Sequence, residues 1–300
     1  MKKKIYIVLS LIVFLSLLIY YQQGFEKGEE YESWALDYVG EAQNVSSSQI
    51  KVAILDSGIN KSHDALRNVQ FEEVNIIEPN QPIIDKFGHG TAIAGIIAGE
   101  DVGVNSLDSN IILYDVKVLN DKGEGTIEDI INGIMWSVEQ EVDVINISFG
   151  FFDDKKGLHD AIRAATKEGI VVTAAAGNTM GLSVDYPAKY EEVLSIASID
   201  KNFNIDPQSG YGKIDYSAPG VNVISTDNQG GISEFSGTSF ATAYASGVIA
   251  SIVSTESNIT NIKQLLDTYT LRLNEKPFFG EGIITFKKEY LEETYEKVYN

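Results

Sequence analysis

The stretch Ile50-Lys-Val-Ala-Ile-Leu-Asp-Ser-Gly58 begins as an almost unbroken apolar run and stops abruptly at Asp56. A run of this length, bounded by small and polar residues, predicts a strand that is buried on both faces of a sheet. Three more runs of the same kind follow along the chain, at residues 142–147, 170–174 and 193–199. Buried strands like these are typical of a parallel sheet that is covered by helices.

Between these runs, the apolar residues recur at helical spacing. The helix-like stretches cover residues 91–98, 127–140, 158–168 and 239–254. This alternation predicts an α/β fold with a mainly parallel central sheet that is flanked by helices. In such sheets functional groups gather where strands end and helices begin, so the turns after the strands are the places to search for a site.

The composition excludes several classes of protein. The 300 residues include 43 acidic and 23 Lys or Arg side chains, which gives a net charge of -20 with His neutral. That charge repels phosphates, so we expect no nucleic-acid partner; it permits a basic substrate, although solubility alone also explains it. The chain has no Cys, which excludes a disulfide scaffold, a thiol nucleophile and a thiolate metal site.

The first 21 residues differ in composition from the rest. Three lysines at positions 2–4 precede 17 uncharged residues, 5–21, which is close to the shortest stretch that spans a bilayer. We expect residues 1–21 to be a membrane anchor or a signal segment, with the lysines inside and the bulk of the chain exported. Residues 22–30 are polar and predict a tether. No linker divides residues 31–300, so we expect one extracytoplasmic domain there, either membrane-anchored or secreted.

Four polar residues occupy the turns in which a site is expected. Asp56 follows the first strand directly, and Asn178 follows the small-residue end of the third. His89, which lies between two glycines, and Ser239 each begin a helix of small residues. Taken singly, each has an ordinary structural explanation, because Asp and Ser often cap helices and Asn often lies in turns.

Together these residues resemble a known family. The order Asp, His, Ser along the chain is the order of the catalytic triad in subtilisin-like serine proteases. The motifs that carry the resemblance are Asp56-Ser-Gly, His89-Gly-Thr-x-x-Ala-Gly95, Ala175-Ala-Gly-Asn178, Gly237-Thr-Ser-x-Ala241, and the segments 144–150, 186–190 and 218–220. The resemblance implies a subtilisin-like three-layer fold, a peptidase domain over residues 31–300, and serine endopeptidase activity that requires no cofactor.

The resemblance also implies a role for each matched residue. Ser239 corresponds to the nucleophile and His89 to the general base, while Asp56 orients the imidazole and stabilises its protonated form. Asn178 matches the side-chain amide of the oxyanion hole, with the Ser239 backbone N–H as the second donor.

The same resemblance assigns the substrate-binding positions. They are Gly123, Gly125, Ile127, Ser148, Phe149, Gly150, Ala176 and Asp185. The first three match a segment beside which substrate pairs as an added strand, and Ile127 with Ile130 predicts an aliphatic pocket further upstream. Asp185 matches the floor of the pocket for the side chain before the scissile bond, which predicts cleavage after Arg or Lys. The alternative is that Asp185 points to solvent beside Lys189.

The family often has a structural calcium site, but this chain departs from its pattern. Ala65 stands where the family has an Asp ligand, and the loop over residues 99–110 is short. Calcium takes about 6–8 oxygen ligands, so the loss of a carboxylate weakens the site. We therefore expect no metal at the usual position, although a different calcium site could form from Asp64, Asp101, Asn105 and Asp108.

Several uses of such a protease stay open. A membrane-tethered enzyme with a basic preference and only about 12 residues between the apolar run and Trp34 resembles the leader peptidases that mature lantibiotic peptides. General degradation of extracellular protein is the competing use, and a catalytically silent homologue that only binds peptides is a third interpretation. A nucleotide-binding protein is disfavoured, because neither Gly-x-Gly-x-x-Gly nor Gly-Lys-Ser/Thr occurs.

Overall fold

The computed structural model describes residues 33–42, 49–105, 110–255, 261–273 and 276–299, and from Ser33 onward the chain forms one compact unit. The expected membrane segment over residues 1–21 and the tether over residues 22–30 lie outside the described residues. Within the described ranges, no helix combines the length and the apolar character that crossing a membrane requires.

A nine-stranded sheet forms the centre of the part of the chain that the structure describes. Its strands, in the order in which they lie side by side, are β10 (Thr270–Arg272), β11 (Gly282–Ile284), β7 (Tyr216–Pro219), β6 (Leu194–Ile199), β5 (Val171–Ala175), β4 (Val144–Ile147), β1 (Ile50–Asp56), β3 (Ile111–Lys117) and β2 (Gln70–Asn75). All neighbours are parallel except the edge pair β10 and β11. A separate antiparallel hairpin consists of β8 (Val223–Thr226) and β9 (Ile232–Phe235).

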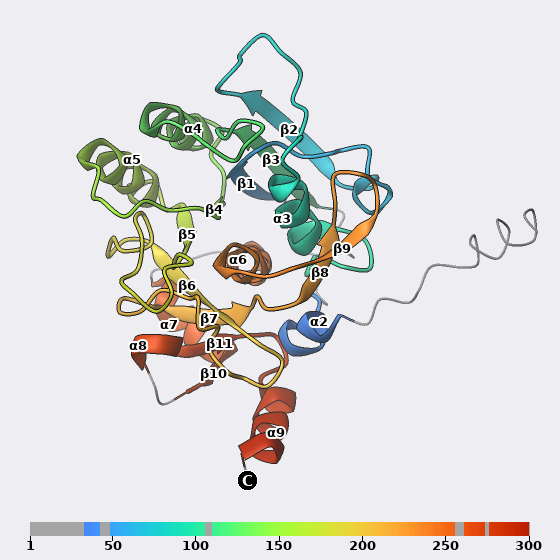
Figure 1. Ribbon diagram of the computed structural model, residues 1–300, viewed down its shortest axis with the longest axis vertical. Helices are drawn as coiled ribbons and strands as arrows, with labels where there is room; N and C mark the ends of the chain where they lie inside the picture. The colour runs from blue at the N-terminus through green and yellow to red at the C-terminus, as the bar shows by residue number, and fades with distance from the viewer. Residues whose placement is uncertain (1–32, 43–48, 106–109, 256–260, 274–275, 300) are drawn as a thin grey trace, which may run out of the picture. The chain divides into compact units, whose positions relative to one another are not determined.

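Helices cover both faces of this sheet (Figure 1). The α-helices are α2 (Trp34–Val39), α3 (His89–Ala98), α4 (Ile127–Glu139), α5 (Lys156–Lys167), α6 (Thr238–Thr255), α7 (Ile262–Leu266), α8 (Lys276–Phe279) and α9 (Lys288–Tyr299). Two short 3₁₀ turns cover Asp64–Leu66 and Asp267–Tyr269. Figure 1 shows α4 and α5 on one side of the sheet and α6 on the other. The predicted α/β class, with a mainly parallel sheet flanked by helices, is confirmed.

Burial explains why these segments form these elements. The buried residues of α5 are Leu158, Ala161, Ile162 and Ala165, which is the spacing of one helical face. Helix α6 is instead buried nearly all round, from Thr238 to Ile252, because it packs on the middle strands while α3 covers its other side. Strands β1, β4 and β5 are apolar on both faces, as strands between two helical layers must be.

The register of the parallel strands sets the position of the site. Leu55 pairs with Ile147, and Ile147 pairs with Ala174, so β1, β4 and β5 end at the same edge. The residues that follow these three strands are therefore neighbours in space. They include Asp56 at the end of β1, and the segments that carry Ser148 and Asn178.

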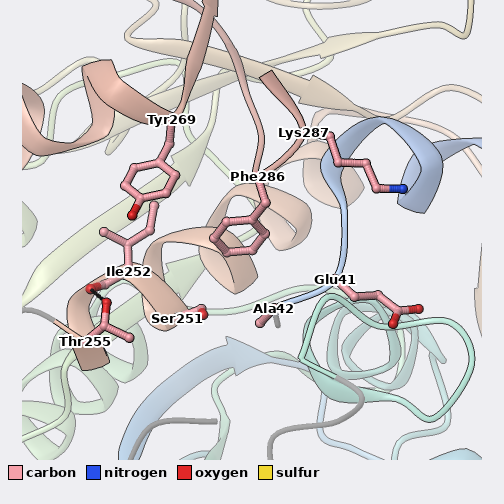
Figure 2. A pocket seen from close by; sticks show the side chains of 8 residues that line it. All are labelled: Glu41, Ala42, Ser251, Ile252, Thr255, Tyr269, Phe286 and Lys287. Carbon is pink, nitrogen blue, oxygen red and sulfur yellow. Dashed lines mark hydrogen bonds between the residues drawn. The ribbon is translucent and has the colours of Figure 1, made fainter. Parts of the chain in front are cut away.

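A cavity of about 270 Å³ lies at the C-terminal end of α6. Figure 2 shows its lining side chains, with Tyr269 on one side and Glu41 and Lys287 on the other. Ile252 in its wall is 13 residues from Ser239 along α6, which corresponds to about 20 Å at the helical rise per residue. This cavity is therefore distinct from the region in which the strand ends meet.

Candidate active site

Asp56 and His89 form a hydrogen-bonded pair. Nδ1 of His89 lies 2.9 Å from Oδ1 and 2.8 Å from Oδ2 of Asp56, which is 1% exposed. The Ser57 N–H donates to Asp56 Oδ1 at 2.7 Å and fixes the carboxylate. Burial opposes protonation of His89, but the charge and hydrogen bond of Asp56, together with the charge of Asp85, outweigh it and raise the pKa of His89 above its usual 6.5.

The glycines beside His89 are required by close backbone contacts. A Cβ on Gly90 would lie 2.2 Å from the Gly58 carbonyl oxygen. Gly88, at the N-cap of α3, has a φ of 89°, in the left-handed region that favours glycine. The Gly-His-Gly sequence thus lets the first turn of α3 approach the end of β1, which brings the imidazole onto Asp56.

Ser239 lies in the first turn of α6 and is partly exposed. Its hydroxyl donates to the Ser148 carbonyl oxygen at 2.6 Å, so in this state it is bonded to Ser148 and not to His89. The Ser148 hydroxyl lies 2.8 Å from Asn146 Oδ1 and 3.2 Å from the Ser239 carbonyl oxygen, which ties the end of β4 to α6. The ring centroid of Phe240, the residue after Ser239, lies 5.6 Å from that of His89.

Asn178 is held by its side-chain oxygen. Asn178 Oδ1 accepts from the Thr238 N–H and from Thr238 Oγ1, both at 3.1 Å. A Cβ on Gly237 would lie 3.0 Å from Asn178 Nδ2, so the amide nitrogen lies against the backbone just before Ser239. The oxygen is thereby occupied, and the NH₂ group remains as a donor beside the serine.

Asp185 lies between two glycine-containing segments. A Cβ on Gly177 would come within 2.5 Å of Asp185 Oδ2, and one on Gly150 within 2.7 Å of Asp185 Cβ. The Asp185 N–H donates to the Ala176 carbonyl oxygen at 3.0 Å, which fixes its backbone beside the oxyanion segment. The structure therefore brings Asp185, Gly150 and Ala176 together, as expected of a pocket wall. Phe149 is partly buried in the same strand-end segment.

The charge state of Asp185 depends on burial and on Lys189. Burial raises the pKa of Asp185, and the positive charge of Lys189 partly offsets this. Lys189 Nζ lies over the Tyr186 ring, 5.4 Å from its centroid. The lysine is thus engaged by the aromatic ring next to Asp185, which leaves the carboxylate to face the two glycines.

The segment over residues 120–127 lies outside the strands and contains a tight turn, in which the Gly123 N–H donates to the Asn120 carbonyl oxygen at 3.0 Å, before α4 begins at Ile127. Gly123 has a φ of 76°, and a Cβ there would lie 2.7 Å from the Phe87 ring, while one on Gly125 would lie 2.6 Å from the Val118 carbonyl oxygen. Ile127 is partly buried at the start of α4. The prediction that Ile130 lines an upstream pocket is wrong, because Ile130 is 0% exposed and packs in the core beneath α4.

The described part of the loop considered for calcium is hydrogen-bonded within the chain. Glu100 pairs with Arg67 at 3.2 Å, and its N–H donates to the Ala65 carbonyl oxygen at 2.8 Å. Asn105 donates its amide to the carbonyl oxygens of Ile97 and Gly247. Asp108 lies outside the described residues, and within them no three His, Cys, Asp or Glu side chains form a metal-binding group. The expectation that no metal binds at the family's usual position stays a prediction, because residues 106–109 of this loop lie outside the described residues.

Two residues of the site were not found from the sequence. Asp85 accepts hydrogen bonds at the start of α3, and Thr238 holds Asn178. An Asp shortly before a helix is a capping signal that could have indicated Asp85. The contact of Thr238 with Asn178 spans 60 residues of sequence, and no local pattern reveals it.

An Asp–His pair at the carboxyl edge of a parallel sheet, together with a serine in the first turn of a buried helix, is the arrangement expected of a serine peptidase of the α/β class. The sequence profile of the subtilase family matches residues 47–277. The chain therefore belongs to the subtilase family.

Individual relatives agree with this assignment. Subtilisin DY of Bacillus licheniformis is 34% identical over 253 residues, which are 81% of this chain and 92% of that protein. The Minor extracellular protease Epr of Bacillus subtilis (strain 168) is 30% identical over 287 residues, 91% of this chain and 44% of that protein. The crystal structure of a cold adapted subtilisin-like serine proteinase matches with a TM-score of 0.73 and 25% identity, over 84% of this chain and 96% of that one. This chain is accordingly a subtilisin-like serine endopeptidase that acts on peptides or proteins.

Proposed function

We propose that Asp56, His89 and Ser239 form the catalytic triad of this endopeptidase. The observation that carries the proposal is the contact of His89 Nδ1 with both oxygens of Asp56, at 2.9 and 2.8 Å, which leaves Nε2 to act as the base. His89 takes the proton of Ser239 as the hydroxyl attacks the peptide carbonyl, and then gives it to the leaving amine. Asp56 holds the imidazole in the required tautomer and stabilises the imidazolium.

The oxyanion of the tetrahedral intermediate is bound by two donors in this proposal. They are Nδ2 of Asn178 and the backbone N–H of Ser239. The support is the orientation of Asn178, whose oxygen is occupied by Thr238. A donor that is already oriented needs no reorganisation as charge develops on the substrate oxygen.

The substrate side chain before the scissile bond is Arg or Lys. The support is Asp185, which lies against Gly150 and Gly177 while Lys189 lies over Tyr186. Two unit charges 4 Å apart attract by about 4 kcal/mol at an effective dielectric near 20. Solvation of the free cation returns much of this energy, so we expect a preference of about tenfold to several hundredfold over an apolar residue.

Peptide profiling tests this specificity. Peptides that end in Arg, Lys or Phe at the cut are compared on the wild-type chain and on Asp185→Asn, with Asp153→Asn as the matched control, since Asp153 is an exposed acid in a neighbouring loop. We expect Arg and Lys to be preferred by the wild type and the control, and the preference to fall at least tenfold in Asp185→Asn. Equal kcat/KM for Arg and Phe in the wild type contradicts the proposal.

The enzyme acts outside the cytoplasm, either anchored through residues 1–21 or secreted, and it requires no cofactor. One relative is named an extracellular protease, and the lysines that precede the apolar run favour export of the chain. Its proposed use is the removal of a leader from a secreted peptide, with general extracellular degradation as the alternative. A lanthipeptide precursor with Arg at its leader junction, cleaved there and at no other bond, favours maturation; cleavage of casein at many sites favours degradation.

Labelling with a fluorophosphonate tests the triad directly. We expect the folded chain to be labelled at Ser239, and labelling to be lost in Ser239→Ala. Ser236→Ala serves as the control, because this exposed serine of the same loop bonds only to Asn222. A folded wild type that resists labelling refutes the protease and leaves a peptide-binding homologue.

A further inference from the structure

Asp85 is a buried acid that the proposed triad does not use. It is 6% exposed and lies in the turn that leads into α3. Its Oδ1 accepts from Ser57 Oγ at 2.8 Å and from the Gly88 N–H at 2.7 Å. Its Oδ2 accepts from the N–H and Oγ1 of Thr91, at 3.0 and 2.6 Å. All four donors are neutral groups, and none of them is a cation.

Ser57 connects this carboxylate to the catalytic pair. Its N–H donates to Asp56 Oδ1 at 2.7 Å, and its hydroxyl donates to Asp85 while accepting from the Gly90 N–H at 3.1 Å. Its carbonyl oxygen accepts from Lys117 Nζ. Ser57 is fully buried, so no water competes for these bonds. Ser57 is therefore hydrogen-bonded to both carboxylates, to Asp85 through its hydroxyl and to Asp56 through its N–H.

The other side of Asp85 reaches His89. Gly88, which donates to Asp85, is the residue before His89, and Thr91 is two residues after it. Asp85 therefore forms hydrogen bonds to both ends of the first turn of α3. Because His89 lies between these two anchoring points, its ring can rotate only about its own side-chain bonds.

We propose that Asp85 is a positioning residue, which joins Ser57 to the first turn of α3 and so holds Asp56 and His89 in the geometry required for proton transfer. This inference rests on the proposed triad. A misplacement of about 1 Å in such a site can cost about 100-fold in rate. The hydrogen bonds of Asp85 prevent such a displacement between two elements, β1 and α3, whose residues 56 and 89 are far apart in the sequence.

The charge of Asp85 adds a second, separable effect. Among the described residues, the charged groups around His89 are Asp56 from β1, Asp85 from the turn, and Lys117 from β3, whose ammonium bonds to Ser57. The remaining neighbours of the imidazole and of Asp85 are uncharged: Phe87, Phe240 and Asn228. Loss of the charge at position 85 therefore favours the neutral imidazole and lowers the pKa of His89.

Two variants separate position from charge. Asp85→Asn removes the charge and turns one acceptor into a donor, whereas Ser57→Ala removes two hydrogen bonds, to Asp85 and from the Gly90 N–H, and keeps the charge. The readout is the rate of fluorophosphonate labelling, and kcat/KM, as functions of pH. We expect Asp85→Asn to lower the plateau about tenfold to 100-fold and to move the acid limb about half a pH unit or more toward lower pH. Ser57→Ala is expected to lower the plateau and leave the acid limb in place.

The control is Asp227→Asn. Asp227 accepts only from its own turn, from the backbone N–H groups of Gln229 and Gly231 and from Ser233 Oγ, so we expect both limb and plateau to match the wild type. Thermal unfolding establishes that each variant is folded. An unchanged acid limb or plateau in folded Asp85→Asn overturns the inference, while a wild type that is not labelled overturns the triad itself. If Asp85→Asn does not fold, a wild-type plateau in Ser57→Ala overturns the positioning role.

Discussion

At the level of single residues, the two polar atoms of Asn178 have different partners. Thr238 occupies the oxygen with two hydrogen bonds, while the nitrogen lies beside the backbone before Ser239. A side chain held by one end and free at the other is suited to stabilise a charge that exists only during the reaction. The surface position of Asn178 also means that the fold does not depend on it.

Asn178→Ala is therefore expected to impair turnover without unfolding the chain. For the corresponding asparagine of subtilisin, the loss in kcat is about 100-fold to 1,000-fold, and we expect a loss of that order here. The measurement is kcat on an Arg peptide, with thermal unfolding as the check on folding. Unchanged turnover in the variant removes Asn178 from the oxyanion hole.

His89 sets the lower pH limit of activity. Burial disfavours its charged form, but Asp56 and Asp85 raise the pKa of His89 above 6.5. Only the neutral imidazole accepts the Ser239 proton, so kcat/KM is expected to rise with pH through a value above 6.5. The same shift stabilises the fold below the unfolded pKa and loses this contribution as pH rises through the folded one. An acid limb centred below 6.5 contradicts the influence of the two carboxylates.

At the level of elements, the edge of the sheet next to β1 carries a buried charge. Asp115 on β3 is 1% exposed and accepts from Lys61 at 2.6 Å, while Lys61 also contacts Glu73 on β2 at 2.5 Å. Burial raises the pKa of Asp115 to about 6, against the attraction of Lys61. Lys61 has a raised pKa because its two acidic partners outweigh its own burial. Lys61 thus links the loop after β1 to β3 and to the edge strand β2.

The raised pKa of Asp115 predicts how stability changes with pH. Since the folded state binds the proton more tightly than the unfolded chain, this group makes the free energy of unfolding fall as pH rises from about 4 to about 6. A shift of that size corresponds to roughly 3 kcal/mol. We expect Asp115→Asn to reduce the fall in the free energy of unfolding between about pH 4 and 6, measured by urea unfolding. Asp143→Asn, next to β4, should change this fall much less. If the free energy of unfolding depends on pH in Asp115→Asn as it does in the wild type, Asp115 is not the cause of this dependence.

The elements that the sequence predicts are those whose pattern is local. The strand over residues 50–55 and the helix over residues 127–140 match β1 and α4 to within one residue at each end. The pair β10 and β11 is not predictable in this way, because each strand has three residues and exists through its pairing with the other. Periodicity needs a longer window than three residues.

The same distinction holds for the site. The positions of Asp56 and His89 at turns predicted their proximity, which the structure shows, while the role of Ser239 as their partner stays a prediction. Ile130 was misplaced, since a helix beginning at Ile127 turns that position toward the sheet. Asp85 was missed because its hydrogen-bond partners lie on two elements. These bonds form only when the end of β1 packs against α3, so no local sequence pattern indicates them.

At the level of the whole molecule, the first and last described segments support each other. Thr285 Oγ1 donates to the Tyr38 carbonyl oxygen at 2.7 Å, and the Phe286 N–H donates to that of Val39 at 2.8 Å. Trp34 Nε1 donates to the Asn222 carbonyl oxygen at 3.0 Å, next to the loop that precedes Ser239. Helix α2 is therefore held by the end of the chain and by the neighbourhood of the nucleophile.

The loop after α3 is held in a comparable way, by the chain itself. The Val104 N–H donates to the Ile96 carbonyl oxygen at 2.9 Å, and the Glu100 N–H donates to that of Ala65 at 2.8 Å. The carboxylate of Glu100 is neutralised by Arg67. A bound cation serves to gather carbonyl and carboxylate oxygens of a loop, and Arg67 already has this role for the carboxylate of Glu100.

This arrangement leads us to propose that the fold is stable without calcium. Because Arg67 already pairs with the carboxylate of Glu100, we expect removal of calcium to leave this acid neutralised. We expect the melting temperature in EGTA to stay within about 2 °C of that in calcium, which corresponds to less than about 1 kcal/mol for a domain of this size. Arg67→Ala is the informative comparison, because it exposes Glu100 and should make stability respond to calcium more than in the wild type. A large loss of melting temperature when the wild-type chain is treated with EGTA contradicts the proposal and indicates a site formed by other oxygens.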